Sequence, residues 1–507
     1  MKLLISTIKT ENRSTELILN NLYSIVADAP IDARIHSFES TDSDYDIYVY
    51  LIREKYDAIY FHVDQFNEVR INHICEMVKQ VSSTTTIMVG GLEVSFDTRQ
   101  YMTDNPYVDY VIRGEGETVF FNYVRGMLTY DTDFEEIEGL AFRKNGEIMV
   151  NPFDEAVDVE KLPFVYDKTD VKEGDTVYYE TIRGTSDRSI FQQFLPDARV
   201  RALPVGRVCT EVRYFLIKNA RRVIFLDRWF NFNADRAYRI FEHIIFNDNG
   251  KTTFEMDIDA ENLDDETIRL LAEARPGLFV FNLDIGTTNS ETLAALGRRE
   301  NIYELMYNVT KLMNNRNLDI KLKITAGLPL ETLSHFANSF NKVYGLGDGN
   351  SLEIETARVP RGCHLREDVS KYGYIFTNYA PYDVLANSYM SANEMIKIRC
   401  MANITKTYIS DHFKLTIPRM LNDTGLKPFD LFFKLADFIY GNELEDKLVK
   451  KEDLYRILYR FAVILYEDLD YGNKCQTLKE TMIQDLAGTM TPGQIERFEK
   501  KGWELDD

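Results

Sequence analysis

The chain has 507 residues, of which 45% are hydrophobic and 12% aromatic, and its formal net charge is −22. Such a length and composition are typical of a globular protein with room for roughly two to four domains and a sizeable core. The acidic balance argues against binding to nucleic acid or to an anionic membrane, since both require a basic face.

Cysteine and histidine usage narrows the class further. The five cysteines form no CxxC pair, and the seven histidines form no HxxxH or HExxH pair. This pattern is typical of a reducing compartment and predicts no protein-bound metal site. No run of residues approaches the ~18 apolar residues of a membrane span, and the apolar start is too short for a signal sequence. We therefore expect a cytoplasmic protein.

Residues 1–128 alternate between strand and helix patterns. Lys2–Ser6 read as a buried strand, and the apolar stripe from Leu17 to Val26 indicates an amphipathic helix. Four more strands are expected within 33–38, 57–63, 85–91 and 109–117. Five strand–helix units predict a parallel, doubly wound sheet of the flavodoxin-like, or Rossmann-like, kind. Its ligands should lie at the carboxyl ends of the strands.

Two glycine-containing segments follow neighbouring strands of this region. They read Gly90-Gly91-Leu92-Glu93-Val94-Ser95 and Arg113-Gly114-Glu115-Gly116-Glu117. Paired glycines let a backbone approach a ligand closely, but they also form ordinary tight turns. Together the segments resemble the GGxExS and RGEGE sequences of the cobalamin (B12)-binding domain that precedes many radical-SAM domains. The resemblance implies that the glycines and the serine line a groove for the nucleotide tail of the corrinoid.

The end of an earlier strand supplies candidate groups beneath the corrin ring. The resemblance places residues 60–67 there, and His62 or Asp64 is a candidate for the position under the cobalt. The simpler alternative is a histidine that forms a hydrogen bond at the strand end. The residues implied for cofactor binding are His62, Asp64, Asn67, Gly90, Gly91, Glu93, Ser95, Gly114, Glu115 and Gly116.

The rest of the chain divides into a linker, a barrel and a tail. Residues 129–175 contain an expected hairpin around Asn145-Gly146. Strand–helix alternation returns over 176–352, with polar residues at strand ends as in a barrel. Residues 353–507 are mostly helical by periodicity. Sequences such as Asp227-Arg228-Trp229-Phe230-Asn231 and Ala326-Gly327-Leu328-Pro329 resemble cobalamin-binding radical-SAM proteins with a DUF4080-type C-terminal region. The resemblance implies a partial TIM barrel.

Residues 177–192 carry the main departure from that family. They resemble the opening of a radical-SAM domain, where a loop of the form RGC-x3-C-x2-C holds a 4Fe–4S cluster through three thiolates. On this spacing the cysteine positions are Thr185, Ser189 and Gln192. Hydroxyl and amide groups do not replace thiolate ligands. We therefore predict that the cluster is absent and that no 5′-deoxyadenosyl radical is formed.

Other contacts of the family have also changed. On the alignment of the TNxETL segment, Asp284 and Gly286 stand where the family has a glycine and a glutamine that help to bind SAM, and Lys323 replaces a common acidic residue. The polar residues expected at the barrel mouth, and hence the catalytic candidates, are Glu180, Arg183, Asp227, Arg228, Asp257, Asp284 and Lys323. The alternative is that Lys323 only neutralises Asp284 in a pocket that has lost its ligand.

Two functions fit these observations. The first is a degenerate member of the family, a pseudoenzyme that retains cobalamin and acts as an accessory or scaffolding protein, with an active radical-SAM paralogue or a substrate protein or peptide as partner. The second is a cluster-independent corrinoid enzyme, for example a methyltransferase that uses cobalamin with or without SAM.

Overall fold

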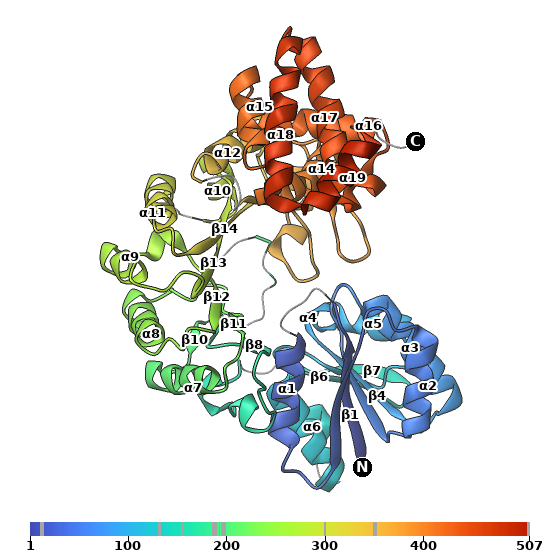
Figure 1. Cartoon of the computed structure of the whole chain (residues 1–507). Helices are drawn as coiled ribbons and strands as arrows, with labels where there is room; N and C mark the ends of the chain where they lie inside the picture. The colour runs from blue at the N-terminus through green and yellow to red at the C-terminus, as the bar shows by residue number, and fades with distance from the viewer. Residues whose placement is uncertain are drawn as a thin grey trace.

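The protein consists of an N-terminal α/β unit, a six-stranded parallel sheet covered by helices, and a helical C-terminal region (Figure 1). The computed structural model describes residues 1–10, 15–129, 133–153, 156–184, 190–191, 193, 199–298, 301–347 and 352–503.

The N-terminal sheet has the strand order β2-β1-β3-β4-β5-β6-β7. The first five strands are parallel, and their order is that of a flavodoxin-like sheet, as predicted. The interior strand β1 is buried at six consecutive positions, because helices cover both faces of the sheet. The strands are β1 (Lys2–Ile8), β2 (Asp32–Phe38), β3 (Ala58–His62), β4 (Thr86–Gly90), β5 (Tyr110–Ile112), β6 (Leu140–Lys144) and β7 (Glu147–Val150).

Two separate hydrophobic clusters hold the helices against this sheet. Helices α2, α3 and α5 contribute to one cluster, whereas α1 and α6 contribute to the other on the opposite face. Ser43 begins α2 by accepting a hydrogen bond from the Asp46 amide, a common N-cap. The helices are α1 (Thr15–Val26), α2 (Asp44–Glu54), α3 (Glu68–Val81), α4 (Leu92–Ser95), α5 (Thr98–Asp104) and α6 (Glu117–Thr129).

The expected hairpin is present and extends the N-terminal sheet. β6 and β7 are antiparallel and meet at Asn145-Gly146, where both residues have positive φ angles of 52° and 86°. Two positive φ angles define the type I′ turn that Asn-Gly favours. The hairpin lies within the residues expected to form the linker, but β6 pairs with β5, so it is part of the N-terminal sheet.

The second sheet contains six parallel strands in the order β15-β14-β13-β12-β11-β8. Its strands are β8 (Thr176–Tyr179), β11 (Arg222–Phe225), β12 (Thr253–Asp257), β13 (Phe279–Gly286), β14 (Asp319–Ala326) and β15 (Leu352–Thr356). The short strands β9 (Ile182–Arg183) and β10 (Arg201–Ala202) pair separately. The crossover helices are α7 (Val205–Ile217), α8 (Ala234–Phe246), α9 (Asp265–Leu271), α10 (Ser290–Ala295), α11 (Ile302–Asn314) and α12 (Leu333–Tyr344).

The C-terminal region is built mainly from helices, with a two-stranded hairpin of β16 (Ile375–Phe376) and β17 (Val384–Ala386) between the first and second of them. The helices are α13 (Val369–Tyr372), α14 (Ala392–Tyr408), α15 (Thr416–Thr424), α16 (Pro428–Gly441), α17 (Lys451–Asp468), α18 (Cys475–Thr489) and α19 (Pro492–Lys501). Helix α14 begins at a capping box, in which Ser391 and Glu394 exchange hydrogen bonds with each other's backbone amides.

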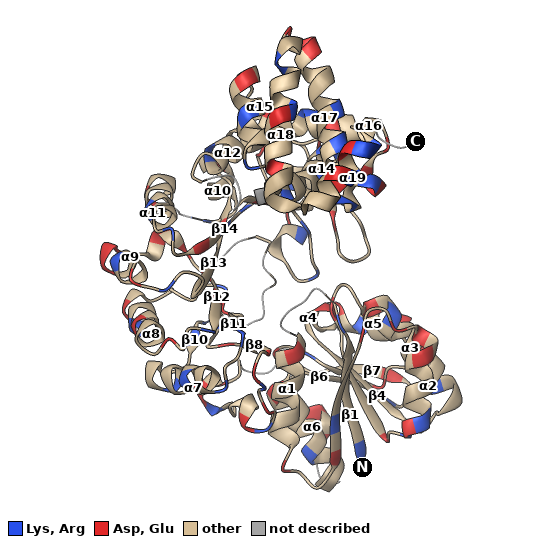
Figure 2. Cartoon of the chain, viewed as in Figure 1, with Lys and Arg blue, Asp and Glu red and all other residues tan. Residues whose placement is uncertain are grey.

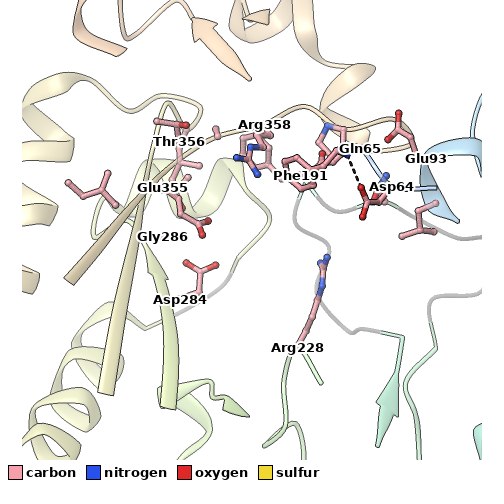
Figure 3. A pocket seen from close by; sticks show the side chains of 18 of the residues that line it. Asp64, Gln65, Glu93, Phe191, Arg228, Asp284, Gly286, Glu355, Thr356 and Arg358 are labelled. Atoms are coloured by element: carbon pink, nitrogen blue, oxygen red, sulfur yellow. Dashed lines mark hydrogen bonds between the residues drawn. The ribbon is translucent and has the colours of Figure 1, made fainter. Parts of the chain in front are cut away.

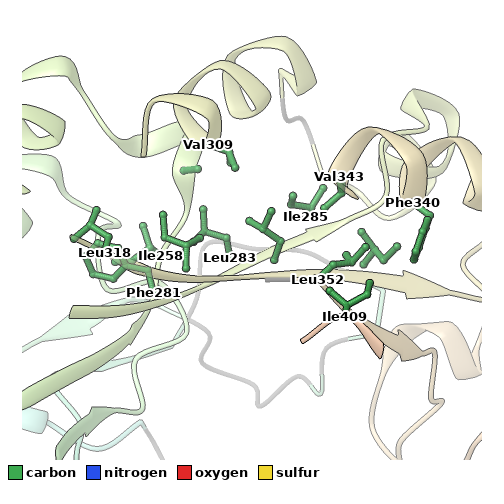
Figure 4. Close-up of a cluster of buried hydrophobic side chains, with 14 of the residues drawn as sticks. Ile258, Phe281, Leu283, Ile285, Val309, Leu318, Phe340, Val343, Leu352 and Ile409 are labelled. Atoms are coloured by element: carbon green, nitrogen blue, oxygen red, sulfur yellow. The ribbon is translucent and has the colours of Figure 1, made fainter. Parts of the chain in front are cut away.

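One hydrophobic cluster joins the second sheet to the C-terminal helices. Apolar side chains of β13 pack beneath α11, and Leu352 of β15 lies in the same group as Ile409 after α14 (Figure 4). The ring centroids of Phe340 and Phe432 lie 6.0 Å apart, which joins α12 to α16. Because α14 packs on the edge strand β15, the helical region covers an edge of the open barrel.

Charged residues of both signs are distributed over the helices, whereas the strands are mostly uncharged (Figure 2). Within the ranges given above, no helix combines the length and the apolar character needed to cross a membrane.

Candidate functional site

A cavity of about 790 Å³ lies where the three parts of the chain meet. The N-terminal unit contributes the end of β3 and the start of α4, and the second sheet contributes the ends of β13, β14 and β15. Helix α14 contributes Arg399, Ala402 and Asn403. The carboxyl ends of two parallel sheets therefore face one space, and its volume is in the usual range for small-molecule sites, ~300–1,000 Å³. Figure 3 shows the labelled side chains converging on this space.

His62 ends β3 and lies in the cavity wall. Its side chain is buried, with a relative exposure of 5% for the residue, and its Nδ1 atom has no hydrogen-bond partner among the described residues. Burial lowers the pKa of His62 to about 4, so the imidazole is neutral at physiological pH. A neutral imidazole carries one N–H and one lone pair, so a ligand beside Nδ1 would satisfy an atom that the described residues leave unpaired.

Asp64 and Asn67 hold the loop after β3 against the end of β1. The Asp64 carboxylate accepts hydrogen bonds from Thr10 Oγ1 at 2.7 Å and from the Phe66 amide at 2.8 Å. Asn67 accepts from the Asp64 amide at 2.9 Å and donates to the Ile8 carbonyl at 3.1 Å. These bonds fix the position of His62 relative to the sheet. Asp64 also lines the cavity, whereas Asn67 does not.

The two glycines of the first predicted segment are needed by the packing of the protein itself. A Cβ atom on Gly90 would meet the Tyr60 hydroxyl, and one on Gly91, whose φ is +116°, would meet the Val63 carbonyl. Ser95 joins the two segments, because its hydroxyl donates to the Gly91 carbonyl at 2.8 Å and accepts from the Gly114 amide at 3.0 Å. The side chain of Tyr60 therefore occupies the place beside Gly90.

Glu93 connects the N-terminal unit to the chain beyond β15. Its carboxylate accepts a hydrogen bond from Tyr382 and pairs with Arg361 at 3.2 Å. Burial raises the pKa of Glu93 to about 7, although the Tyr382 hydrogen bond and the Arg361 charge oppose the shift. Glu68 of α3 lies 3.6 Å from the same arginine. A residue implied for cofactor binding thus also bridges two parts of the fold.

Glu115 and Glu117 form a second bridge, to the chain after β8. Glu117 makes two bonds to Arg183, at 2.6 and 3.0 Å, and Glu115 pairs with Arg201 at 2.6 Å. Arg183 also contacts Glu180 at 2.8 Å. The side chains of Arg183 and Glu117 are only 9% and 3% exposed, so this network is a buried one. Two catalytic candidates, Glu180 and Arg183, are engaged in it.

Asp227 is buried beside the second sheet and does not line the cavity. Its carboxylate accepts hydrogen bonds from the Thr181 and Ile182 amides, at 2.6 and 2.9 Å, and from the Thr181 hydroxyl. Burial raises the pKa of Asp227 to about 7, against the opposing effect of the bonds from Thr181. Asp227 therefore fixes the backbone that leads from β8 to β9.

The remaining candidates divide between the cavity and its surroundings. Arg228 and Asp284 line the cavity, and Figure 3 shows Arg228 extending into it from the loop after β11. Lys323 pairs with Glu355 at 3.1 Å. Burial alone would lower the pKa of Lys323, but Glu355 and Asp284 raise it overall. Asp257 accepts a hydrogen bond from Asn282 at 2.9 Å.

The predicted cluster positions, Thr185, Ser189 and Gln192, lie outside the described residues. Within the described ranges, no group of three or more His, Cys, Asp or Glu residues is arranged to hold a metal ion. The absence of the 4Fe–4S cluster remains a prediction from the sequence.

Several residues of the site were not predicted from the sequence. Arg358 and Arg399 line the cavity, and Arg361, Tyr382 and Arg201 form the two bridges. The only available signal was that Arg361 and Tyr382 belong to a C-terminal stretch that resembles the family. Nothing in their local sequence indicates contact with the N-terminal unit.

Comparisons with known proteins agree with the fold and with the two terminal regions. The profile of the B12 binding domain matches residues 5–124, and that of a protein of unknown function, DUF4080, matches residues 370–502. An uncharacterized methyltransferase of Pyrococcus horikoshii is 27% identical over 179 residues, which are 33% of this chain and 38% of that protein. The match thus spans well under half of the relative's length.

Two solved structures of the cobalamin-dependent S-adenosylmethionine radical enzyme OxsB share the fold. The apo form aligns with a TM-score of 0.65 and 12% identity, covering 100% of this chain and 84% of OxsB. The form with aqua-cobalamin and S-adenosylmethionine bound aligns with a TM-score of 0.63, also at 12% identity, covering 100% and 85%.

The class of protein is therefore an α/β protein with three parts. It has a Rossmann-like B12-binding domain, a parallel six-stranded sheet like the partial barrel of radical-SAM proteins, and a helical C-terminal region. This chain matches the B12 binding domain near its N-terminus and DUF4080 near its C-terminus, and its fold is similar to that of OxsB.

The residues at the edge of the N-terminal sheet fit a corrinoid. His62 has an orphaned buried nitrogen at the cavity wall, and the Gly91 backbone approaches Val63 without a side chain between them. Beside Gly90 the fit is tighter, because Tyr60 fills the place where the resemblance puts the nucleotide tail. A corrinoid at this edge would be held by His62 and the loop through Asp64.

Proposed function

We propose that this protein binds cobalamin at the carboxyl edge of its N-terminal sheet and acts without a 4Fe–4S cluster at residues 185–192. The observation that carries the proposal is His62. A buried polar atom without a partner costs free energy, and a ligand in the adjoining cavity would remove that cost.

The chain's own residues have defined tasks in this proposal. If cobalamin binds, His62 would contact it through a neutral imidazole, and the bonds of Asp64 and Asn67 hold the loop beside His62 in place. Arg228, Asp284, Arg358 and Arg399 line the same cavity and would be available to a second molecule in it. When bound, cobalamin supplies a cobalt centre that can carry a methyl group.

A metal analysis tests the proposal directly. Protein purified anaerobically with iron, sulfide and hydroxocobalamin should contain about one cobalt per chain and no stoichiometric iron. Iron at about four per chain would show that the chain holds a cluster despite Thr185, Ser189 and Gln192. Absence of cobalt would refute cobalamin binding.

The role of His62 has its own experiment. The electron paramagnetic resonance spectrum of the reduced cobalt(II) form should show nitrogen hyperfine splitting that disappears in His62→Gln. The matched control is His73→Gln, because His73 is 62% exposed on α3 and distant from the cavity wall. An unchanged spectrum in His62→Gln would exclude His62 as the axial ligand.

A second candidate function, corrinoid-dependent methyl transfer, is favoured by the cavity itself. The cavity wall carries charged and amide side chains beyond those near His62, among them Arg228, Asp284 and Asn403, and carrying cobalamin alone does not require them. The net reaction would convert SAM and a nucleophilic substrate N–H, O–H or S–H group into S-adenosylhomocysteine, the methylated substrate and a proton. It is redox-neutral, and Asp284 at the cavity wall could accept the proton.

The accessory function makes a different prediction. If the protein carries cobalamin for an active radical-SAM paralogue, it should bind that paralogue and raise its activity, and it should itself produce no S-adenosylhomocysteine. Measuring S-adenosylhomocysteine release by the cobalt-loaded protein, alone and with candidate nucleophiles, separates the two functions.

A further inference from the structure

Two arginines in the cavity wall share one aspartate. Arg358 follows β15, Arg399 lies on α14, and both line the cavity. Arg358 Nε lies 3.3 Å from Asp383 Oδ1, and Arg399 Nη1 lies 3.4 Å from Asp383 Oδ2. Two guanidinium groups beside one carboxylate leave a surplus of one positive charge at this wall.

The contacts of these arginines to Asp383 are long. A charge-assisted N–H···O bond is usually ~2.7–2.9 Å, whereas these two measure 3.3 and 3.4 Å. The arginine side chains also remain 44% and 43% exposed, while Asp383 is 22% exposed. Both guanidinium groups therefore remain partly exposed and keep donors that the aspartate does not use.

Most carboxylates around the cavity already have partners and do not neutralise this surplus. Glu355 pairs with Lys323, Glu93 pairs with Arg361, and Asp64 accepts two hydrogen bonds within its own domain. Asp284 is the remaining acidic residue of the wall, and Arg228 provides a cation that makes no ion pair with any described residue. The wall formed by β15 and α14 is thus cationic in a chain of net charge −22.

The arrangement suits an anion with several oxygen acceptors. Arg399 and Asn403 are four residues apart on α14 and so lie on the same helix face. Both line the cavity with Arg358. Guanidinium groups bind carboxylates and phosphates through paired N–H donors, and the Asn403 amide adds two more.

We propose that Arg358, Arg399 and Asn403 form an anion-binding site for a carboxylate or phosphate group of the molecule that enters the cavity. The helical C-terminal region then recognises the substrate as well as covering the barrel edge. This inference rests on the proposed function in that the cavity is the site of chemistry, but anion binding itself does not require cobalamin.

The test measures binding of inorganic pyrophosphate to the full-length protein by calorimetry at low ionic strength. The variants are Arg358→Gln, Arg399→Gln and the double variant. Lys397→Gln is the matched control, since it removes one positive charge from the same helix at a residue that pairs with Asp437 and does not line the cavity. We expect the double variant to lose at least about tenfold in affinity, and the control to stay within about twofold.

The anion can come from a substrate or from the carboxylate of SAM, and further titrations distinguish the two. If the site holds SAM, Arg399→Gln should weaken SAM binding but not that of methylthioadenosine, which lacks the carboxylate. If it holds another substrate, pyrophosphate should bind equally well in the presence of SAM. Each result assigns the anion and supports the site.

Equal pyrophosphate affinity in the wild type and the double variant, or no binding to the wild type, would overturn the inference. Cobalamin binding by the same preparations keeps this outcome separate from the proposed function. If the protein binds cobalamin normally but does not bind the anion, only the anion site is rejected. If it binds the anion but not cobalamin, only the corrinoid proposal is rejected. Thermal unfolding of each variant checks that substitution of these half-exposed residues leaves the fold intact.

Discussion

The N-terminal domain meets the rest of the chain in two regions that use the same residue types differently. In the bridge of Glu115 and Glu117 to Arg183 and Arg201, the charges are buried and closely paired. At the cavity, Arg228, Arg358 and Arg399 are exposed and loosely paired or unpaired within the described structure.

The comparison shows that an arginine at a domain boundary can either stabilise the fold or be available to bind a ligand. A buried guanidinium requires its carboxylate partners, because an uncompensated charge in a low-dielectric environment is costly. A half-exposed guanidinium keeps its solvation and can exchange water for a ligand. Burial, more than residue type, separates the structural arginine from the binding one, and the following predictions test that distinction in order of expected effect.

The largest effect should come from Arg183→Met. The substitution leaves Glu117, which is 3% exposed, without its cation, and breaking a buried pair in this way costs about 3–5 kcal/mol. Denaturant unfolding measures the loss. The control is Lys168→Met, which breaks a solvent-exposed pair with Asp28 between the same units and should cost a small fraction of that value. Equal losses would contradict the assignment of the bridge.

Gly91→Ala should follow, at about 3 kcal/mol. Its φ of +116° disfavours any Cβ, and that atom would also meet the Val63 carbonyl beside His62. Gly146→Ala is the matched control, because its φ is +86° but nothing lies within 4 Å of the added atom. If both variants unfold at the same denaturant concentration, the close approach at Gly91 does not matter for stability.

Glu93→Gln should change the pH dependence of stability. The unfolded chain releases this proton near its ordinary pKa of 4.5, whereas the folded protein releases it at about 7. The folded state therefore binds more protons between these values, and wild-type stability falls as pH rises through that window. The free energy of unfolding should fall between pH 5 and pH 7.5, and this fall should be smaller in the variant by about 2 kcal/mol. Parallel profiles would show that Glu93 ionises normally.

The smallest effect on stability is expected for Arg399→Gln. Its side chain is 43% exposed and its contact to Asp383 is 3.4 Å, so the free energy of unfolding should change by no more than about 0.5 kcal/mol. A loss comparable to that of Arg183→Met would show that the cavity arginines are structural too, and the comparison between the two regions would fail.

Much of the fold could be predicted from the sequence, because its signals are local. The alternation of apolar strand and helix patterns predicts the parallel sheets, and Asn145-Gly146 predicts the hairpin. That the hairpin belongs to the N-terminal sheet depends on its pairing with β5, which no local pattern reveals. For the candidate site, the glycine segments could be located, but their partners could not. Tyr382 lies 289 positions from Glu93, and Arg201 lies 86 from Glu115.

The same limit explains why only some of the predicted catalytic candidates line the cavity in the structure. Strand-end position places Arg228 and Asp284 at the cavity, but the same reasoning applies to Asp227. The amides of Thr181 and Ile182 and the Thr181 hydroxyl bond its carboxylate away from the cavity lining. Side-chain direction after a strand alternates and depends on the loop that follows. Sequence spacing alone therefore indicates the edge of the sheet and leaves open which residues face the ligand.

The cavity wall is built from residues between Ile18 and Asn403, and this has a consequence for the order in which it forms. On the ribosome, the N-terminal sheet is complete at Val150 and can fold early, whereas α14 begins at Ala392, more than two hundred residues later. A ligand that contacts every side of the cavity can bind fully only after the C-terminal helices have packed against the second sheet. A chain truncated before α14 should therefore keep its first domain and lack the side of the cavity formed by Arg399, Ala402 and Asn403.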